Sequence, residues 1–207
     1  MAPDRPNYLV RNASPSDWSR AKLLADFRYP WLARRAPRTH FRALVWQDRF
    51  HFLFDVENRE LVLSEADDAL TRVLDSDRVE LFFAADVALE AYFGFEIDPR
   101  GGVHDFAAKF YRQFDNDWRF PGLEAEGALT HAGYRVAGSF PLATFRALSL
   151  LDAHTQNVRA GVYRADFSLN AQGELVRDWI SWVQPETTTP DFHVPSSFGT
   201  FQLEQVR

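Results

Sequence analysis

Polar and apolar residues alternate along several segments of this chain, and this alternation limits its possible folds more than any other feature. Residues 50–56, FHFLFDV, place three phenylalanines and a valine on one side of an extended backbone. Successive side chains of a strand point to opposite faces, so a period of two predicts a strand with one face in a core. The same pattern occurs in residues 41–47, 78–83, 91–98, 134–140, 158–169 and 199–206. This number of short strands predicts an all-β fold, an antiparallel jelly-roll-like β-sandwich.

Helical signals are few and short. Residues 14–27, 64–74 and 141–148 are expected to contain a turn or two of helix, with Ser64 and Asp67 as a capping box and Pro141 at a first helical position. The composition of residues 115–131 and 185–199 predicts loops. The 207 residues contain no linker and no internal repeat, so we expect one domain over residues 1–207.

Composition excludes several classes of site and partner. The chain has no Cys, and its single Met is the initiator, which excludes disulfides, thiolate metal sites and axial Met ligation of haem. The net charge is −6 and the basic residues are scattered, which argues against nucleic acid as a partner. No apolar run is long enough for a membrane span. No leader is visible at the N-terminus, so we expect a cytoplasmic protein, or a secreted or periplasmic one if a leader was removed.

Two glutamates are expected to face each other across a central hairpin. If its turn is centred near Ala88, Glu80 pairs with Glu96, and the phenylalanines of both strands lie on the opposite face. Paired like charges are unfavourable, so they predict a cation, an arginine such as Arg164, or a ligand rich in hydroxyl groups. Two alternatives stay open. A register shifted by two would leave both glutamates solvated, and a carboxylate pair could serve a glycoside-processing enzyme as acid and base.

The tryptophans indicate a second part of the same site. An aromatic ring can stack on the apolar face of a sugar while acids and amides bind its hydroxyl groups. Trp179 and Trp182 are three residues apart, which places them on opposite faces of a strand, and one of them is expected at an exposed rim. The histidines are too dispersed for a metal motif. Asp98 and Asp105 are a weak candidate for calcium.

Several of these segments together resemble the family 9 carbohydrate-binding module, in particular its stand-alone branch. The resemblance covers roughly residues 8–206 and rests on the segments RALVWQDRFHFLFDVEN, DSDRVELFF, YFGFEIDPRGG, YRVAGSFPLATF and VRAGVYRAD. Its most specific part is the closing motif, which combines Ser181, Trp182, Pro185, Phe192, His193, Pro195, Phe198 and Gly199.

The resemblance implies a β-sandwich that binds sugars without catalysis, at the ends of xylan or of glucans such as cellulose, with structural calcium in some members. It implies that Trp182 is one clamp tryptophan and that Glu80 contacts the sugar. Leu74 stands where the family has the second clamp tryptophan. The predicted site therefore consists of Glu80, Glu96, Trp182, Trp179 and Arg164, with an oligo- or polysaccharide as the ligand.

Overall fold

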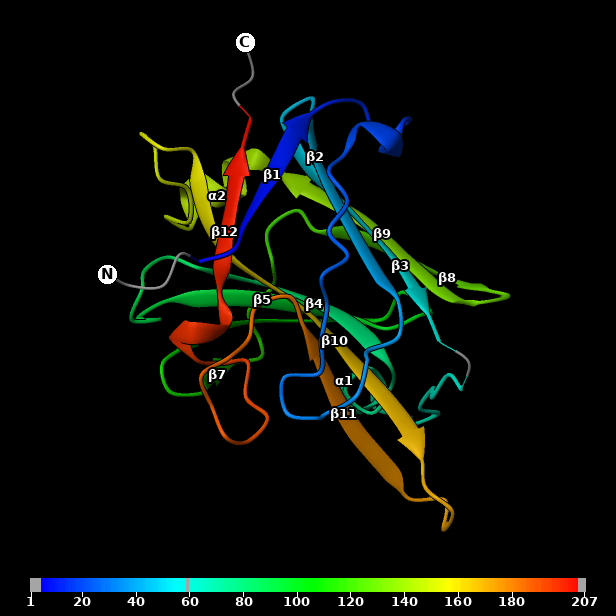
Figure 1. The fold of residues 1–207 in the computed structure, drawn as a ribbon. Coiled ribbons are helices and arrows are strands. Elements are labelled where there is room, and N and C mark those ends of the chain that lie inside the picture. Colours follow the sequence, from blue (N-terminus) through cyan, green and yellow to red (C-terminus); the bar gives the residue numbers. More distant parts are fainter. Residues whose placement is uncertain (1–4, 59, 205–207) are drawn as a thin grey trace.

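The computed structural model describes residues 5–58 and 60–204, which form a β-sandwich (Figure 1). The strands are β1 (Asn7–Asn12), β2 (Thr39–Trp46), β3 (Arg49–Glu57), β4 (Arg78–Ala84), β5 (Tyr92–Ile97), β6 (Val103–Lys109), β7 (Gln113–Asp115), β8 (Glu124–Thr130), β9 (Gly133–Pro141), β10 (Asn157–Leu169), β11 (Leu175–Ser181) and β12 (Gly199–Leu203). The helices are η1 (Trp18–Arg20), α1 (Ala69–Leu74), α2 (Leu142–Ala147) and η2 (Pro195–Ser197). None of the helices described is long and apolar enough to cross a membrane.

The strands follow one path of pairing through two sheets. The first sheet has the order β7-β6-β5-β4-β10-β12-β1, and β11 pairs with β10. The second has the order β1-β2-β3-β9-β8. The strand β1 joins the two, because its residues 7–10 pair with β12 and its residues 11–12 pair with β2. Both of these pairings are parallel, whereas the other strand pairs are antiparallel, as the sequence predicts.

The alternating segments become strands, and the β-sandwich predicted from them is confirmed. The prediction of a loop over residues 115–131 was wrong in its second half, which forms β8. This strand lies at a sheet edge and is exposed along most of its length, so its sequence lacks the expected alternation.

Helices are shorter than predicted. Residues 14–27 contain only the turn η1, and Asp68 rather than Ser64 caps α1 by accepting a hydrogen bond from Thr71 N.

Phenylalanine rings fill the space between the two sheets. Phe83 of β4 is fully buried, and its ring lies 5.2 Å from that of Phe145 and 5.8 Å from that of Phe140, measured between centroids. Phe50 of the second sheet lies 6.3 Å from Phe83. Such edge and tilted contacts are the favoured arrangements of aromatic pairs. The phenylalanine rings thus form the core between the inner faces of the two sheets.

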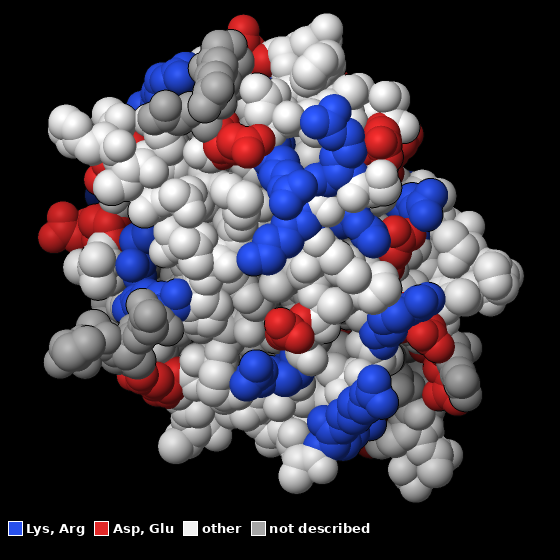
Figure 2. Space-filling view, turned by 45° about the horizontal axis from the view of Figure 1, so that its top comes forward, with Lys and Arg blue, Asp and Glu red and all other residues white. Residues whose placement is uncertain are grey.

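The surface carries charges of both signs. Asp55 on β3 lies 2.8 Å from Arg135 and 3.7 Å from Arg42, and Glu124 lies 3.1 Å from Arg49. In the view of Figure 2, Lys and Arg side chains lie among Asp and Glu side chains. Exposed pairs of this kind contribute little to stability, on the order of 0–1 kcal/mol each.

Candidate functional site

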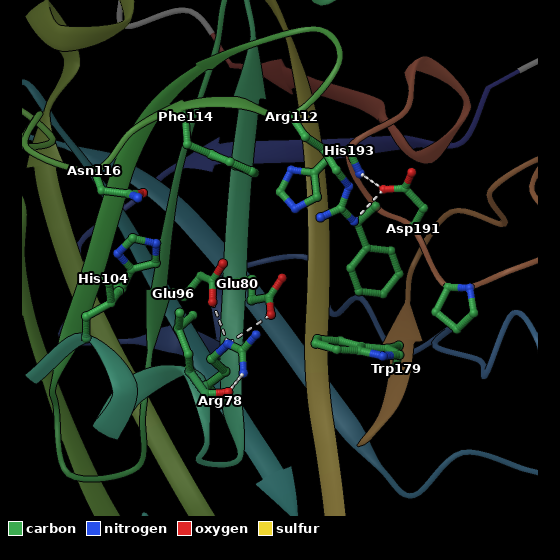
Figure 3. A pocket seen from close by; sticks show the side chains of 14 residues that line it. Arg78, Glu80, Glu96, His104, Arg112, Phe114, Asn116, Trp179, Asp191 and His193 are labelled. Atoms are coloured by element: carbon green, nitrogen blue, oxygen red, sulfur yellow. Dashed lines mark hydrogen bonds and ion pairs between the residues drawn. The ribbon is translucent and has the colours of Figure 1, made fainter. Parts of the chain in front are cut away.

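A cavity of about 320 Å³ lies on the outer face of the first sheet. Its floor consists of Arg78 and Glu80 on β4, Glu96 on β5 and His104 on β6 (Figure 3). The strand register brings these residues together, because Glu80 pairs with Glu96 and Glu96 pairs with His104. Residues paired in this way point to the same face of a sheet. The predicted pairing of the two glutamates is therefore confirmed, and the register shifted by two is excluded.

Arg78 compensates the two carboxylates. Its Nε atom lies 2.5 Å from Glu96 Oε2 and 3.1 Å from Glu80 Oε1, and its Nη1 atom donates to the carbonyl of Leu74 at 2.9 Å. All three charged side chains are buried, with Glu80 2% and Glu96 6% exposed. Nε carries a single hydrogen, which it donates to Glu96. Glu80 Oε1 is consequently left without a hydrogen-bond donor among the described residues.

Burial shifts the ionisation of the groups around the cavity. Burial, together with the charge of Glu96, raises the pKa of Glu80 well above the usual range of a carboxyl group. Burial lowers the pKa of His193 to about 3 and lowers that of His104 as well. Both imidazoles are therefore neutral at pH 7, and Glu80 favours its protonated form. The cavity has little excess charge, which suits an uncharged polar ligand.

The walls of the cavity combine an aromatic ring with aliphatic side chains. Trp179 on β11 lines one side, and the Arg78 guanidinium carbon lies 5.3 Å from the centroid of its ring. Leu70 and Leu74 of α1 also line the cavity. Leu74, at the position where the resemblance implies a second clamp tryptophan, is thus placed at the cavity by α1. A ring bound here would meet one indole and the aliphatic side chains of α1.

The roof joins two segments far apart in the sequence. Asp191, in the loop before η2, accepts hydrogen bonds from Tyr111 Oη at 2.6 Å and from Arg112 Nη2 at 3.0 Å. Tyr111 and Arg112 belong to the turn between β6 and β7. The rings of the neighbouring His193 and of Phe114 on β7 are perpendicular, with their centroids 5.0 Å apart. Figure 3 shows Asp191, His193 and Arg112 together above the floor.

Two residues of the predicted site lie elsewhere. Arg164 pairs with Val79, one residue before Glu80, so its side chain lies on the inner face of the sheet. It is fully buried there and bonds to Thr39 and Asp166, whereas Arg78 takes the role expected of it. Trp182 is 5% exposed and packs at 5.8 Å against Phe201 in the core. Trp179 and Trp182 do lie on opposite sides, as their spacing predicts, and Trp179 is the one at the cavity.

The calcium candidate has no support in the geometry of the described residues, which contain no group of three or more potential metal ligands of the His, Cys, Asp or Glu type. Asp98 accepts hydrogen bonds from the backbone N–H groups of Arg100 and Gly102 and so closes its own turn. Asp105 accepts from Phe120 N. Both carboxylates are thus engaged with backbone donors, and they do not converge on a shared ligand.

The sequence interpretation missed Arg78, His104, Arg112, Asp191 and His193 as members of the site. A signal for Arg78 was present, because a residue two positions before Glu80 points to the same face of a strand. His104 could be found only after the pairing of β5 with β6 was known. Arg112, Asp191 and His193 lie in or beside loops, where no periodicity predicts direction.

Comparisons with known proteins agree with this architecture. The sequence model described as "Carbohydrate family 9 binding domain-like" matches residues 14–206. A crystal structure from Bacteroides uniformis ATCC 8492 is similar with a TM-score of 0.70 and 15% identity, over 97% of this chain and 100% of that one. A family 9 module from Caldicellulosiruptor kristjanssonii in complex with glucose has a TM-score of 0.63 and 13% identity, over 98% and 97% of the two chains. The complex of such a module from the same organism with cellotriose has a TM-score of 0.64 and 14% identity, over 98% and 95%.

No curated protein sequence matches this chain significantly. The match of the family's sequence model extends over nearly the whole chain and includes every residue of the cavity. The chain therefore belongs to the family of carbohydrate family 9 binding domain-like proteins.

Proposed function

We propose that this protein binds a carbohydrate in the cavity above Arg78, Glu80 and Glu96, without catalysis. The observation that carries the proposal is a buried ionic cluster open to a cavity beside an indole ring. Glu80 and Glu96 both line the cavity, and carboxyl groups can accept hydrogen bonds from sugar hydroxyl groups.

A sugar matches the remaining chemistry of the cavity. Its hydroxyl groups both donate and accept, and can bond to carboxylate and guanidinium groups together. Its C–H face can pack on Trp179, and Leu74 can contact its other side. Family membership supports this reading. The related modules in complex with glucose and with cellotriose support glucose and its β-linked oligomers as the first ligands to test.

Glycoside processing is the second candidate, because the raised pKa of Glu80 is a property of general acids. Against it stands Arg78, which holds the partner carboxylate in a hydrogen bond. Turnover of aryl glycosides by the wild type and by Glu80→Gln separates the two functions. We expect no turnover by either protein, and turnover that Glu80→Gln abolishes would favour the enzyme.

Isothermal titration with a panel of mono- and oligosaccharides tests the binding proposal. We expect heat with at least one neutral sugar and a loss of about tenfold or more in affinity for Trp179→Ala, the equivalent of about 1.4 kcal/mol. Trp46→Ala is the matched control, since this tryptophan is exposed and does not line the cavity. Absence of heat with every sugar for a folded sample, or equal affinity of Trp179→Ala and the wild type, would refute the proposal.

A further inference from the structure

Exposed aromatic rings gather on the hairpin beside the cavity. Among the described residues the exposed aromatic side chains are Trp46, Phe110, Tyr111 and Phe114, and the last three belong to the hairpin of β6 and β7. This hairpin forms the edge of the first sheet. Large apolar groups clustered on a surface commonly mark a place where something binds. Phe114 lines the cavity, whereas Phe110 and Tyr111 do not, so the cluster is a candidate for recognition that extends beyond the cavity.

Tyr111 is fixed at one end and open at the other. Its hydroxyl group donates to Asp191 Oδ2 at 2.6 Å, and Asp191 is itself buried and bonded to His193 N at 2.9 Å. The residue as a whole is nevertheless 51% exposed. An anchored hydroxyl limits rotation of the ring, so the ring loses little further freedom when a ligand packs on it. This arrangement is that of a rigid aromatic platform.

The platform continues directly from the cavity. Asp191 and Arg112 both line the cavity, and both contact Tyr111. The guanidinium carbon of Arg112 lies 5.6 Å from the centroid of the Tyr111 ring, and the ring of Phe110 lies 5.3 Å away on the same turn. A ligand that leaves the cavity past Asp191 would meet these groups in succession.

We propose that Tyr111 forms a second sugar subsite, which holds the next residue of an oligosaccharide whose first ring occupies the cavity. This inference rests on the proposed function. The charge of Arg112 is compensated by Asp191 at 3.0 Å, so the surface between the two subsites suits a neutral chain rather than an acidic one. Arg112 retains further N–H donors for hydroxyl groups of the second ring.

Titration of Tyr111→Ala with glucose and with cellotriose tests the subsite. We expect cellotriose affinity to fall about tenfold more than glucose affinity, because both ligands depend on the roof but only the longer one reaches the platform. Tyr111→Phe keeps the ring and is expected to retain most of the cellotriose affinity. Trp46→Ala is the control for an exposed aromatic residue away from the cavity. If Tyr111→Ala does not fold, Tyr111→Leu removes the ring while keeping an apolar side chain.

The outcomes separate the two proposals. If the wild type binds both sugars and Tyr111→Ala changes neither affinity, the subsite is refuted and the cavity stands. If both affinities fall equally, Tyr111 acts only through the roof, which also refutes the subsite. If the wild type binds no sugar, the proposed function fails and the subsite fails with it. A concentration-dependent dimer that Tyr111→Ala abolishes, observed by sedimentation velocity, would assign the ring to a protein contact instead.

Discussion

Replacing Arg78 by Met tests how the floor of the cavity is stabilised. The substitution introduces an unbranched apolar side chain and removes the charge that lies 2.5 Å from Glu96 and 3.1 Å from Glu80. Removal of one partner from a buried ionic cluster commonly costs about 3–5 kcal/mol, because the remaining charge is uncompensated. The carboxylate that has lost its compensating charge would take up a proton to avoid this cost. We therefore expect the free energy of unfolding to fall sharply at neutral pH.

The size of this loss depends on pH in a defined way. Keeping neutral a carboxyl group with a reference pKa of about 4.3 costs about 1.4 kcal/mol for each pH unit above that value. The expected loss for Arg78→Met relative to the wild type is therefore about 3.7 kcal/mol at pH 7 and about 1.6 kcal/mol at pH 5.5. For a chain of this size, the loss at pH 7 corresponds to a melting temperature lower by about 7–15 °C.

Urea unfolding of both proteins at the two pH values measures this difference. Arg177→Met is the control, because Arg177 pairs with Asp75 at the surface and its side chain is 47% exposed, so we expect a loss below about 1 kcal/mol. The reasoning is refuted if Arg78→Met costs no more than this control. A loss that is the same at pH 5.5 and pH 7 would also refute it, since it would indicate lost packing rather than an uncompensated charge.

Three further substitutions test other parts of the structure. Trp182→Ala should cost about 3–5 kcal/mol in urea unfolding, because the ring lies in the core, while sugar affinity of the folded fraction stays unchanged in titration. Phe83→Ala should cost a similar amount, since the buried ring contacts phenylalanines of both sheets. The lowered pKa of His193 means that its contribution to stability is present above about pH 6.5 and is lost as the pH falls from there toward 3, because the unfolded chain takes up the proton first. Between pH 7 and pH 5, the free energy of unfolding of His193→Gln should therefore change by about 2 kcal/mol less than that of the wild type. An equal change in both proteins would contradict this assignment.

The sequence predicted those parts of the site that depend on local periodicity. The pairing of Glu80 with Glu96 follows from the alternation in β4 and β5 and from the position of the turn between them. The same rule places Arg164 on the inner face, but only when its partner Val79 in β4 is known. Pairing between β10 and β4 joins segments about 80 residues apart, and no sequence period specifies that register.

The roof could not be predicted for a different reason. Asp191 and Arg112 are brought together by a turn and a loop, and their direction depends on hydrogen bonds rather than on strand geometry. The strand β8 was missed because an exposed edge strand does not need an apolar face. The spacing of Trp179 and Trp182 predicts that they lie on opposite faces of a strand. It does not indicate which of the two meets solvent.

The burial of Arg78, Glu80 and Glu96 has a consequence for how ligand preference can change in such proteins. Each of these residues contributes to folding as well as to binding, so most replacements at the floor would be selected against before any new ligand could be bound. Leu74 lines the cavity and Tyr111 borders it. Neither side chain is charged and fully buried, so we expect their replacement to cost less stability than replacement of the floor residues. Variation in ligand preference among related chains should therefore accumulate at the walls and rim, while the ionic floor remains as inherited.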